Sequence, residues 1–155
     1  MPAVPAVPAV PETAAPARRV LVVDDEPAIR ELLAMVCAYE GWDVRTAGAG
    51  EAALSAIGAD PPDVVLLDRM LPDLDGLTVL RRIHASSPAL PVIMVTARDS
   101  AEDRAALFAA GATGYVTKPF GVAALTDEVR RAFGQVAART PVPSRTASTT
   151  PASTR

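Results

Sequence analysis

The chain has 155 residues, of which 50% are apolar and 21% are charged, so most of it can fold around a hydrophobic core and is not disordered. No stretch approaches the apolar length that crosses a bilayer, and a formal net charge of −3 argues against nonspecific binding to nucleic acid. The single cysteine, Cys37, cannot form an internal disulfide, which favours a reducing, cytoplasmic setting.

The two ends of the chain differ in composition from the middle. Residues 1–17 repeat Pro-Ala-Val every three residues, a spacing that suits polyproline II and cannot form a core. Proline interrupts every apolar stretch there and no basic segment precedes it, so these residues do not resemble a secretory signal. Residues 135–155 are rich in Ala, Thr, Ser, Pro and Arg and are typical of a flexible tail or linker. We therefore expect one domain over residues 18–134.

Short apolar runs alternate with helical patterns through this domain. The runs predict strands at 18–23, 43–47, 63–67, 91–95 and 113–117. The apolar spacing, with Pro27 as a start signal and Gly41 and Gly111 as stop signals, predicts the intervening helices. These helices run from Pro27 to Gly41 and over 49–57, 75–85 and 101–110, and a last one carries Val122, Leu125, Val129 and Ala132 on one face.

The alternation of strands and helices predicts an α/β fold with a doubly wound, five-stranded parallel sheet. Continuous apolar runs mark the first, third and fourth strands as central, and the second as an edge. The expected strand order is 2-1-3-4-5, the flavodoxin-like arrangement, with the functional site outside the carboxyl ends of the strands.

Polar and charged side chains follow the strands at that edge. Asp24 and Asp25 follow the first strand and Asp68 follows the third, while Thr96 and Lys118 follow the fourth and fifth. Carboxylates that repel one another favour a cation, and oxygen ligands of this kind suit Mg²⁺. A hydroxyl and an ammonium group nearby suit a phosphoryl group. No glycine-rich phosphate loop is present, so the pattern does not predict a nucleotide site.

Lys118 is the only lysine among the 15 basic residues. In a chain that otherwise uses arginine, one lysine at a strand end indicates a site that needs a compact point charge.

These residues resemble the receiver domain of two-component response regulators. The similarity lies in Asp24-Asp25, Asp68, Thr96 and Lys118-Pro119, and in the strings VLVVDDEPAIRELL, DVVLLDRMLPDLDGL, VIMVTA and GATGYVTKPF. It covers essentially all of 18–134.

The resemblance implies a role for each matching residue. Asp68 would accept a phosphoryl group as an acyl phosphate. Asp25 would ligate Mg²⁺ directly and Asp24 mainly through water, with Asp68 and the main-chain carbonyl of Met70 as further ligands. Thr96 and Lys118 would bind the phosphoryl group, and Tyr115 would move inward with Thr96 on activation. The bond before Pro119 would be cis.

The resemblance also implies partners. A sensor histidine kinase would supply the phosphoryl group, an output domain or protein would read the switch, and the domain would catalyse only its own phosphorylation and dephosphorylation. We expect no membrane association and no direct binding of nucleic acid. We expect a monomer that forms a weak dimer on phosphorylation, through the fourth helix, fifth strand and fifth helix. The dimer would be weak because Thr113 and Gly114 stand where relatives carry a pair of acids.

Other interpretations fit the sequence less well or apply to single residues. A phosphatase of the haloacid dehalogenase type needs Asp-x-Asp followed by Thr, which Asp24-Asp25-Glu26-Pro27 does not provide. The two aspartates at 24 and 25 could instead cap a helix, which leaves Asp68 unexplained, whereas Asp73 and Asp75 are expected to be turn and cap residues. Whether the chain is a single-domain regulator or the receiver part of a DNA-binding regulator stays open.

Overall fold

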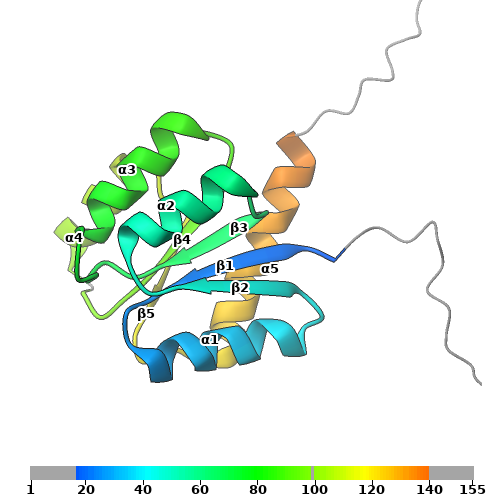
Figure 1. Ribbon diagram of the computed structural model, residues 1–155. Coiled ribbons are helices and arrows are strands. Elements are labelled where there is room, and N and C mark those ends of the chain that lie inside the picture. The colour runs from blue at the N-terminus through cyan, green and yellow to red at the C-terminus, as the bar shows by residue number, and fades with distance from the viewer. Residues whose placement is uncertain (1–16, 99, 140–155) are drawn as a thin grey trace, which may run out of the picture.

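The computed structural model describes residues 17–98 and 100–139, in which five strands alternate with five helices (Figure 1). The elements in chain order are β1 (Arg19–Val23), α1 (Pro27–Tyr39), β2 (Asp43–Ala47), α2 (Gly50–Ala59), β3 (Val64–Leu67), α3 (Gly76–Ser86), β4 (Val92–Thr96), α4 (Ala101–Ala109), β5 (Gly114–Thr117) and α5 (Val122–Arg139).

The strands form one sheet in the order β2-β1-β3-β4-β5, and every neighbouring pair is parallel, which confirms the predicted fold class and topology. The central strands β1, β3 and β4 are buried almost throughout, as their continuous apolar runs predicted, while β2 lies at an edge. Because all strands run the same way, their carboxyl ends meet at one edge of the sheet.

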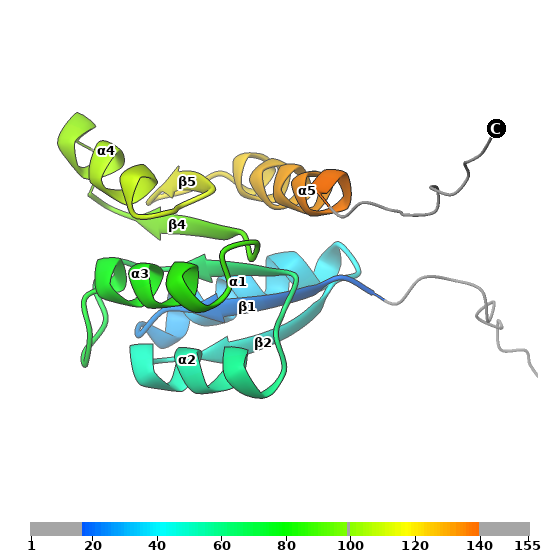
Figure 2. The ribbon, with the colours of Figure 1, turned by 90° about the horizontal axis from the view of Figure 1, so that it is seen from above.

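Two hydrophobic cores lie on opposite faces of the sheet, because successive strand residues point to opposite sides. Val20 and Val22 of β1 pack with α1 and α5, including Cys37 and Phe133. Leu21, which lies between these two valines in β1, packs with α2, α3 and α4 on the other face. In Figure 2, which looks down on the sheet, α2 and α3 lie in front of the strands and α1 lies behind them.

Side-chain caps and glycines mark several helix ends, as expected for Asp75, Gly41 and Gly111. Asp75 caps α3 by accepting from the Leu77 N–H at 2.9 Å, and Ser100 caps α4 by accepting from the Asp103 N–H at 3.0 Å. Gly41 and Gly111 end α1 and α4 with φ of 90° and 114°, the left-handed conformation that glycine adopts without strain.

Helices α2 and α5 both extend beyond their predicted ends. Helix α2 continues through Gly58 to Ala59, because one glycine lowers helix stability without ending a helix whose other face is packed. Helix α5 continues to Arg139, past the expected domain end at 134, because residues 135–139 are mostly good helix formers.

Residues 1–16, which include the whole Pro-Ala-Val repeat, and residues 140–155 lie outside the described residues. Within 17–98 and 100–139, no helix has both the length and the apolar character required to cross a bilayer.

Candidate functional site

Three carboxylates meet where β1 and β3 end. The pairing of Val23 with Leu67 brings the two strand ends side by side, and the Asp68 N–H donates to the Val23 carbonyl at 3.0 Å. The next residues on β1 are Asp24 and Asp25. One oxygen from each of the three aspartates lies within 4.8 Å of the others, so the structure brings together the acidic residues that the sequence analysis had singled out.

Lys118 joins this cluster from the end of β5. Its main-chain N–H donates to the Thr96 carbonyl at 2.9 Å, which fixes the start of its side chain beside β4. Its ammonium nitrogen, Nζ, lies 2.8 Å from Asp24 Oδ2 and 3.3 Å from Asp68 Oδ2. The Lys118–Pro119 bond is cis, the geometry that the resemblance implied.

These charges are largely withdrawn from water. The exposed fraction is 0% for the Asp24 side chain, 7% for Asp68 and 15% for Lys118. Burial raises the pKa of Asp68 above its usual value and the Asp24 charge raises it further, which outweighs the opposing effect of Lys118. Burial alone would lower the pKa of Lys118, but its contacts with Asp24 and Asp68 raise it overall.

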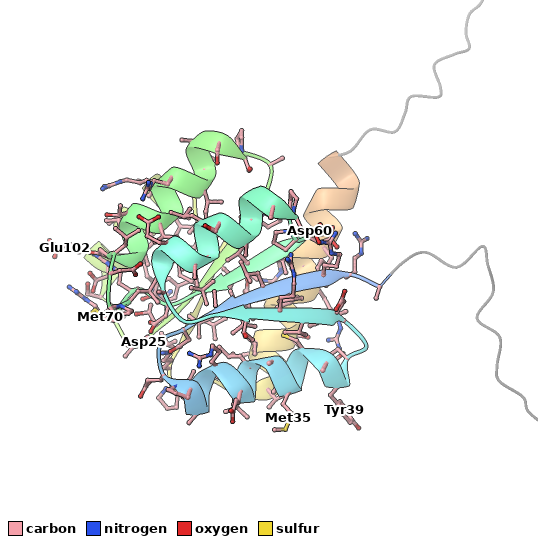
Figure 3. The ribbon with its side chains drawn as sticks, viewed as in Figure 1. Asp25, Met35, Tyr39, Asp60, Met70 and Glu102 are labelled. Carbon is pink, nitrogen blue, oxygen red and sulfur yellow. The ribbon has the colours of Figure 1, made fainter. Side chains whose placement is uncertain are left out.

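The donor set fits a hard divalent cation. Three carboxylates face a single ammonium group, so the cluster retains an excess of negative charge, and oxygen donors are the ligands that Mg²⁺ prefers. Asp25 is exposed, which leaves one side of the cluster open to solvent. Asp25 and Met70 lie toward the same end of the molecule (Figure 3). The main-chain N–H of Met70 lies near enough to the Asp68 carboxylate to lower its pKa, an effect smaller than that of burial.

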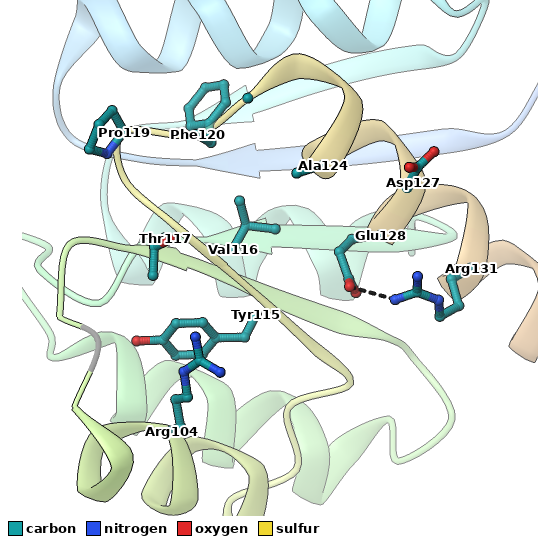
Figure 4. A pocket seen from close by; sticks show the side chains of 11 residues that line it. Arg104, Tyr115, Val116, Thr117, Pro119, Phe120, Ala124, Asp127, Glu128 and Arg131 are labelled. Atoms are coloured by element: carbon teal, nitrogen blue, oxygen red, sulfur yellow. Dashed lines mark hydrogen bonds and ion pairs between the residues drawn. The ribbon is translucent and has the colours of Figure 1, made fainter.

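Thr96 and Tyr115 lie on the two strands next to this cluster. Thr96 is fully buried, and its hydroxyl accepts from the Arg98 N–H at 3.2 Å. Tyr115 is half-buried, with its ring 6.5 Å from the Phe108 ring and 4.9 Å below the Arg104 guanidinium (Figure 4). A groove of about 350 Å³ runs beside Tyr115 between α4 and α5.

Two contributions to this edge were missed by the sequence analysis. Asp73 accepts from the N–H groups of Gly50 and Glu51 at 2.7 and 2.9 Å, so it caps α2 from a different loop. Its role as a cap was expected, but the capped helix was not. Arg69 pairs with Asp75 and Asp103, and nothing local in the sequence indicates the second of these partners.

Comparison with known proteins gives a consistent result. The family model described as "Response regulator receiver domain" matches residues 20–130. The chain is 52% identical over 103 residues to a probable transcriptional regulatory protein, TcrX, of Mycobacterium tuberculosis, covering 66% of this chain and 44% of that protein. It is 44% identical over 112 residues to the response regulator MprA of Mycolicibacterium vanbaalenii, covering 72% and 48%. The chain thus spans about half the length of these relatives.

Solved structures agree with the family match. A CheY-like receiver domain protein from Methanospirillum hungatei superposes with a TM-score of 0.77 at 28% identity, covering 81% of this chain and 100% of that one. The receiver domain of NtrX from Brucella abortus gives a TM-score of 0.71 at 38% identity, covering 74% and 98%.

Proposed function

The chain belongs to the response regulator receiver domain family, and from this premise we propose that Asp68 accepts a phosphoryl group from a sensor histidine kinase. The observation that carries the proposal is the contact of Asp68 with two further carboxylates and one ammonium group at the carboxyl edge of the sheet. Asp68 follows β3, the middle strand of the sheet, and it contacts Lys118 while 7% of its side chain stays exposed, whereas the Asp24 side chain is fully buried.

In the proposed reaction, a carboxylate oxygen of Asp68 attacks the phosphorus atom of a phosphohistidine. The P–O bond forms as the P–N bond breaks, and the electron pair of the P–N bond stays on the departing imidazole. The product is an acyl phosphate on Asp68. The nearly complete burial of this carboxylate limits the access of water that would hydrolyse it.

We assign the metal to Asp24, Asp25 and Asp68, with the main-chain carbonyl of Met70 as a further ligand. When bound there, Mg²⁺ would supply positive charge against the phosphoryl oxygens. Lys118, which contacts both buried aspartates, would pair with a phosphoryl oxygen on the other side. The Thr96 hydroxyl accepts from Arg98, so its own proton can be donated to the phosphoryl group.

The test is the intact mass of the chain after incubation with acetyl phosphate, with Mg²⁺ or with a chelator. The wild type should gain one phosphoryl group only with Mg²⁺, and hydroxylamine should remove it. Asp68→Asn should gain none. Asp43→Asn, which changes an exposed aspartate of β2, should react as the wild type does. Labelling of the Asp68→Asn variant, or labelling in chelator, would contradict the assignment.

For assembly, we propose a monomer that forms a weak dimer through α4, β5 and α5 when Asp68 is phosphorylated. Charges on this face already have partners within the chain. Arg131 pairs with Glu128 at 2.5 Å, and the Glu128 carboxylate lies over Gly114, one of the two positions without an acid. Ion pairs between subunits would have to compete with these contacts. Sedimentation at micromolar concentration, with and without beryllofluoride, tests this; a tight dimer before phosphorylation would contradict it.

For output, we propose that the switch acts on an output domain or a separate protein, and that it does so in the cytoplasm. Two of the similar proteins are named transcriptional regulatory proteins, and each is about twice the length matched here. The sole cysteine, Cys37, is buried and free, as suits a reducing compartment. We propose no direct contact of the described residues with nucleic acid, and no catalysis beyond the domain's own phosphorylation and dephosphorylation.

A further inference from the structure

Arg69, the residue directly after Asp68, has a largely buried side chain whose hydrogen bonds are incomplete. Its side chain is only 11% exposed, and its Nε donates to Asp75 at 3.1 Å. Its Nη1 lies 3.6 Å from Asp103 Oδ1, too far for a hydrogen bond, and this buried nitrogen has no hydrogen-bond partner in the part of the chain that the structure describes. A buried donor without an acceptor is unfavourable, so a closer approach of Arg69 to Asp103 would stabilise this contact.

Asp103 lies close to arginine side chains from two different loops. It lies in the first turn of α4, where it accepts from the Ser100 hydroxyl at 2.9 Å. Its Oδ1 is 3.6 Å from Arg69, in the loop after β3, and also 3.6 Å from Arg98, in the loop after β4. The Ser100 hydrogen bond, followed by Arg98 and Arg69, lowers the pKa of Asp103, so it is ionised at neutral pH. One carboxylate therefore joins α4 to the loops after β3 and β4.

The next residue on α4, Arg104, contacts Tyr115 of β5. The Arg104 guanidinium lies 4.9 Å from the centre of the Tyr115 ring (Figure 4). Adjacent residues of one helical turn thus contact the loop that follows Asp68 and the aromatic side chain of β5. A shift of the first turn of α4 would change both contacts together, because a helical turn moves as a rigid unit.

We propose that Arg69 is a positioning residue that carries the phosphorylation state of Asp68 to Tyr115, through Asp103 and Arg104. The inference rests on the proposed function of Asp68. A phosphoryl group on Asp68 adds bulk and charge beside the main chain of Met70, and so displaces the loop that includes Arg69. Arg69 transmits this displacement to Asp103, and Tyr115 changes its surroundings as Arg104 moves.

The two tyrosines of the chain allow a direct test. Tyr39 is 90% exposed on α1, far along the chain from α4, and serves as an internal reference for Tyr115 in ¹⁹F NMR of the full chain labelled with 3-fluorotyrosine. Acetyl phosphate and Mg²⁺ should shift the Tyr115 signal of the wild type and leave that of Tyr39. Phosphoryl uptake is measured in the same samples by intact mass.

Arg69→Met and Asp103→Asn should take up the phosphoryl group to the wild-type extent. The switched fraction of the Tyr115 signal should fall about fivefold or more in each, the lower end of usual coupling between sites. The double variant should be no worse than either single variant, since both remove one link. Arg69→Lys, which keeps the charge, should recover part of the response. Arg82→Met, which removes an exposed ion pair of α3, is the matched control and should respond as the wild type does.

The outcomes separate the two proposals. No uptake by the wild type would overturn the proposed function and this inference with it. Normal uptake by Arg69→Met with an unchanged Tyr115 shift would overturn this inference alone. A loss of uptake in Arg69→Met and Asp103→Asn that equals the loss of the Tyr115 shift would also overturn it, because the two residues would then serve phosphorylation itself.

Discussion

The two ends of the sheet carry the same kinds of side chain in opposite surroundings. At the amino end of β1, Arg19 pairs with Asp60, and Arg45 lies 3.9 Å from the same carboxylate; these side chains are 32 to 57% exposed. At the carboxyl end, Lys118 pairs with Asp24 and Asp68, which are almost completely buried. Figure 3 places Asp60 and Asp25 toward opposite ends of the molecule.

The ion pairs at the amino end are exposed on the surface, whereas the charges at the carboxyl end are buried by the fold. Water screens the pairs at the amino end, so either partner can be lost at little cost. At the carboxyl end, the charges have lost most of their hydration and depend on one another. A cluster of confined charges responds strongly to a metal ion or a phosphoryl group, which is the property that a phosphorylation switch requires.

The largest effect is expected from Lys118→Met. It leaves two buried carboxylates without their cation, and the loss of one partner of a buried ion pair costs about 3–5 kcal/mol. The free energy of unfolding in urea, measured in chelator, should fall by about this amount. Adding Mg²⁺ should raise the free energy of unfolding more in Lys118→Met than in the wild type, because the ion replaces the lost positive charge. Arg45→Met, at the opposite end, is the control; an equally small loss in both variants would contradict the comparison.

Asp68→Asn should stabilise the protein in chelator at pH 7. Because the folded protein raises the pKa of Asp68, ionisation of this carboxyl opposes folding above the folded pKa, and the opposition disappears below the unfolded pKa of about 4. We expect the melting temperature to rise by about 4 °C, the shift produced by ~1 kcal/mol in a domain of this size. The gain should vanish as the pH falls below about 4. A gain that persists at low pH would mean that packing, not charge, is its cause.

Asp73→Ala should lower the melting temperature at pH 7 by less than Lys118→Met does. The N–H groups of Glu51 and Gly50 lower the pKa of Asp73, so its contribution is present above the unfolded pKa and is lost as the pH falls through the folded pKa. The difference from the wild type should therefore shrink below about pH 4. Ala49→Ser, which supplies a local cap at a position without one, should restore part of the stability of Asp73→Ala.

The smallest effect is expected from Asp60→Asn at the amino end. Arg19 lowers the pKa of Asp60, so the pair favours folding only above the unfolded carboxyl pKa. The pair is exposed, and we expect a change in melting temperature of about 1 °C or less at physiological salt. A loss as large as that of Lys118→Met would remove the distinction between the two ends.

Much of the site was predictable because it depends on strand ends. A run such as VVLL defines its own boundary, and the parallel arrangement requires the following residues to meet at one edge. Asp24, Asp68, Thr96 and Lys118 could therefore be brought together before any contact was known. The caps at Asp75 and Ser100 were predictable for a similar reason, since each bonds within its own helix.

The tertiary structure alone decided which side chains touch. Asp73 caps a helix 22 residues earlier in the chain, and Arg69 meets Asp103 across two loops. Neither contact leaves a periodic signal, because each depends on how separate loops pack and not on local spacing. The burial that gives Asp68 and Lys118 their altered pKa values was likewise fixed only when the sheet, the helices and the loops came together. By itself the sequence determined the order of the elements and the residues at their ends, while long-range packing determined the contacts through which those residues act.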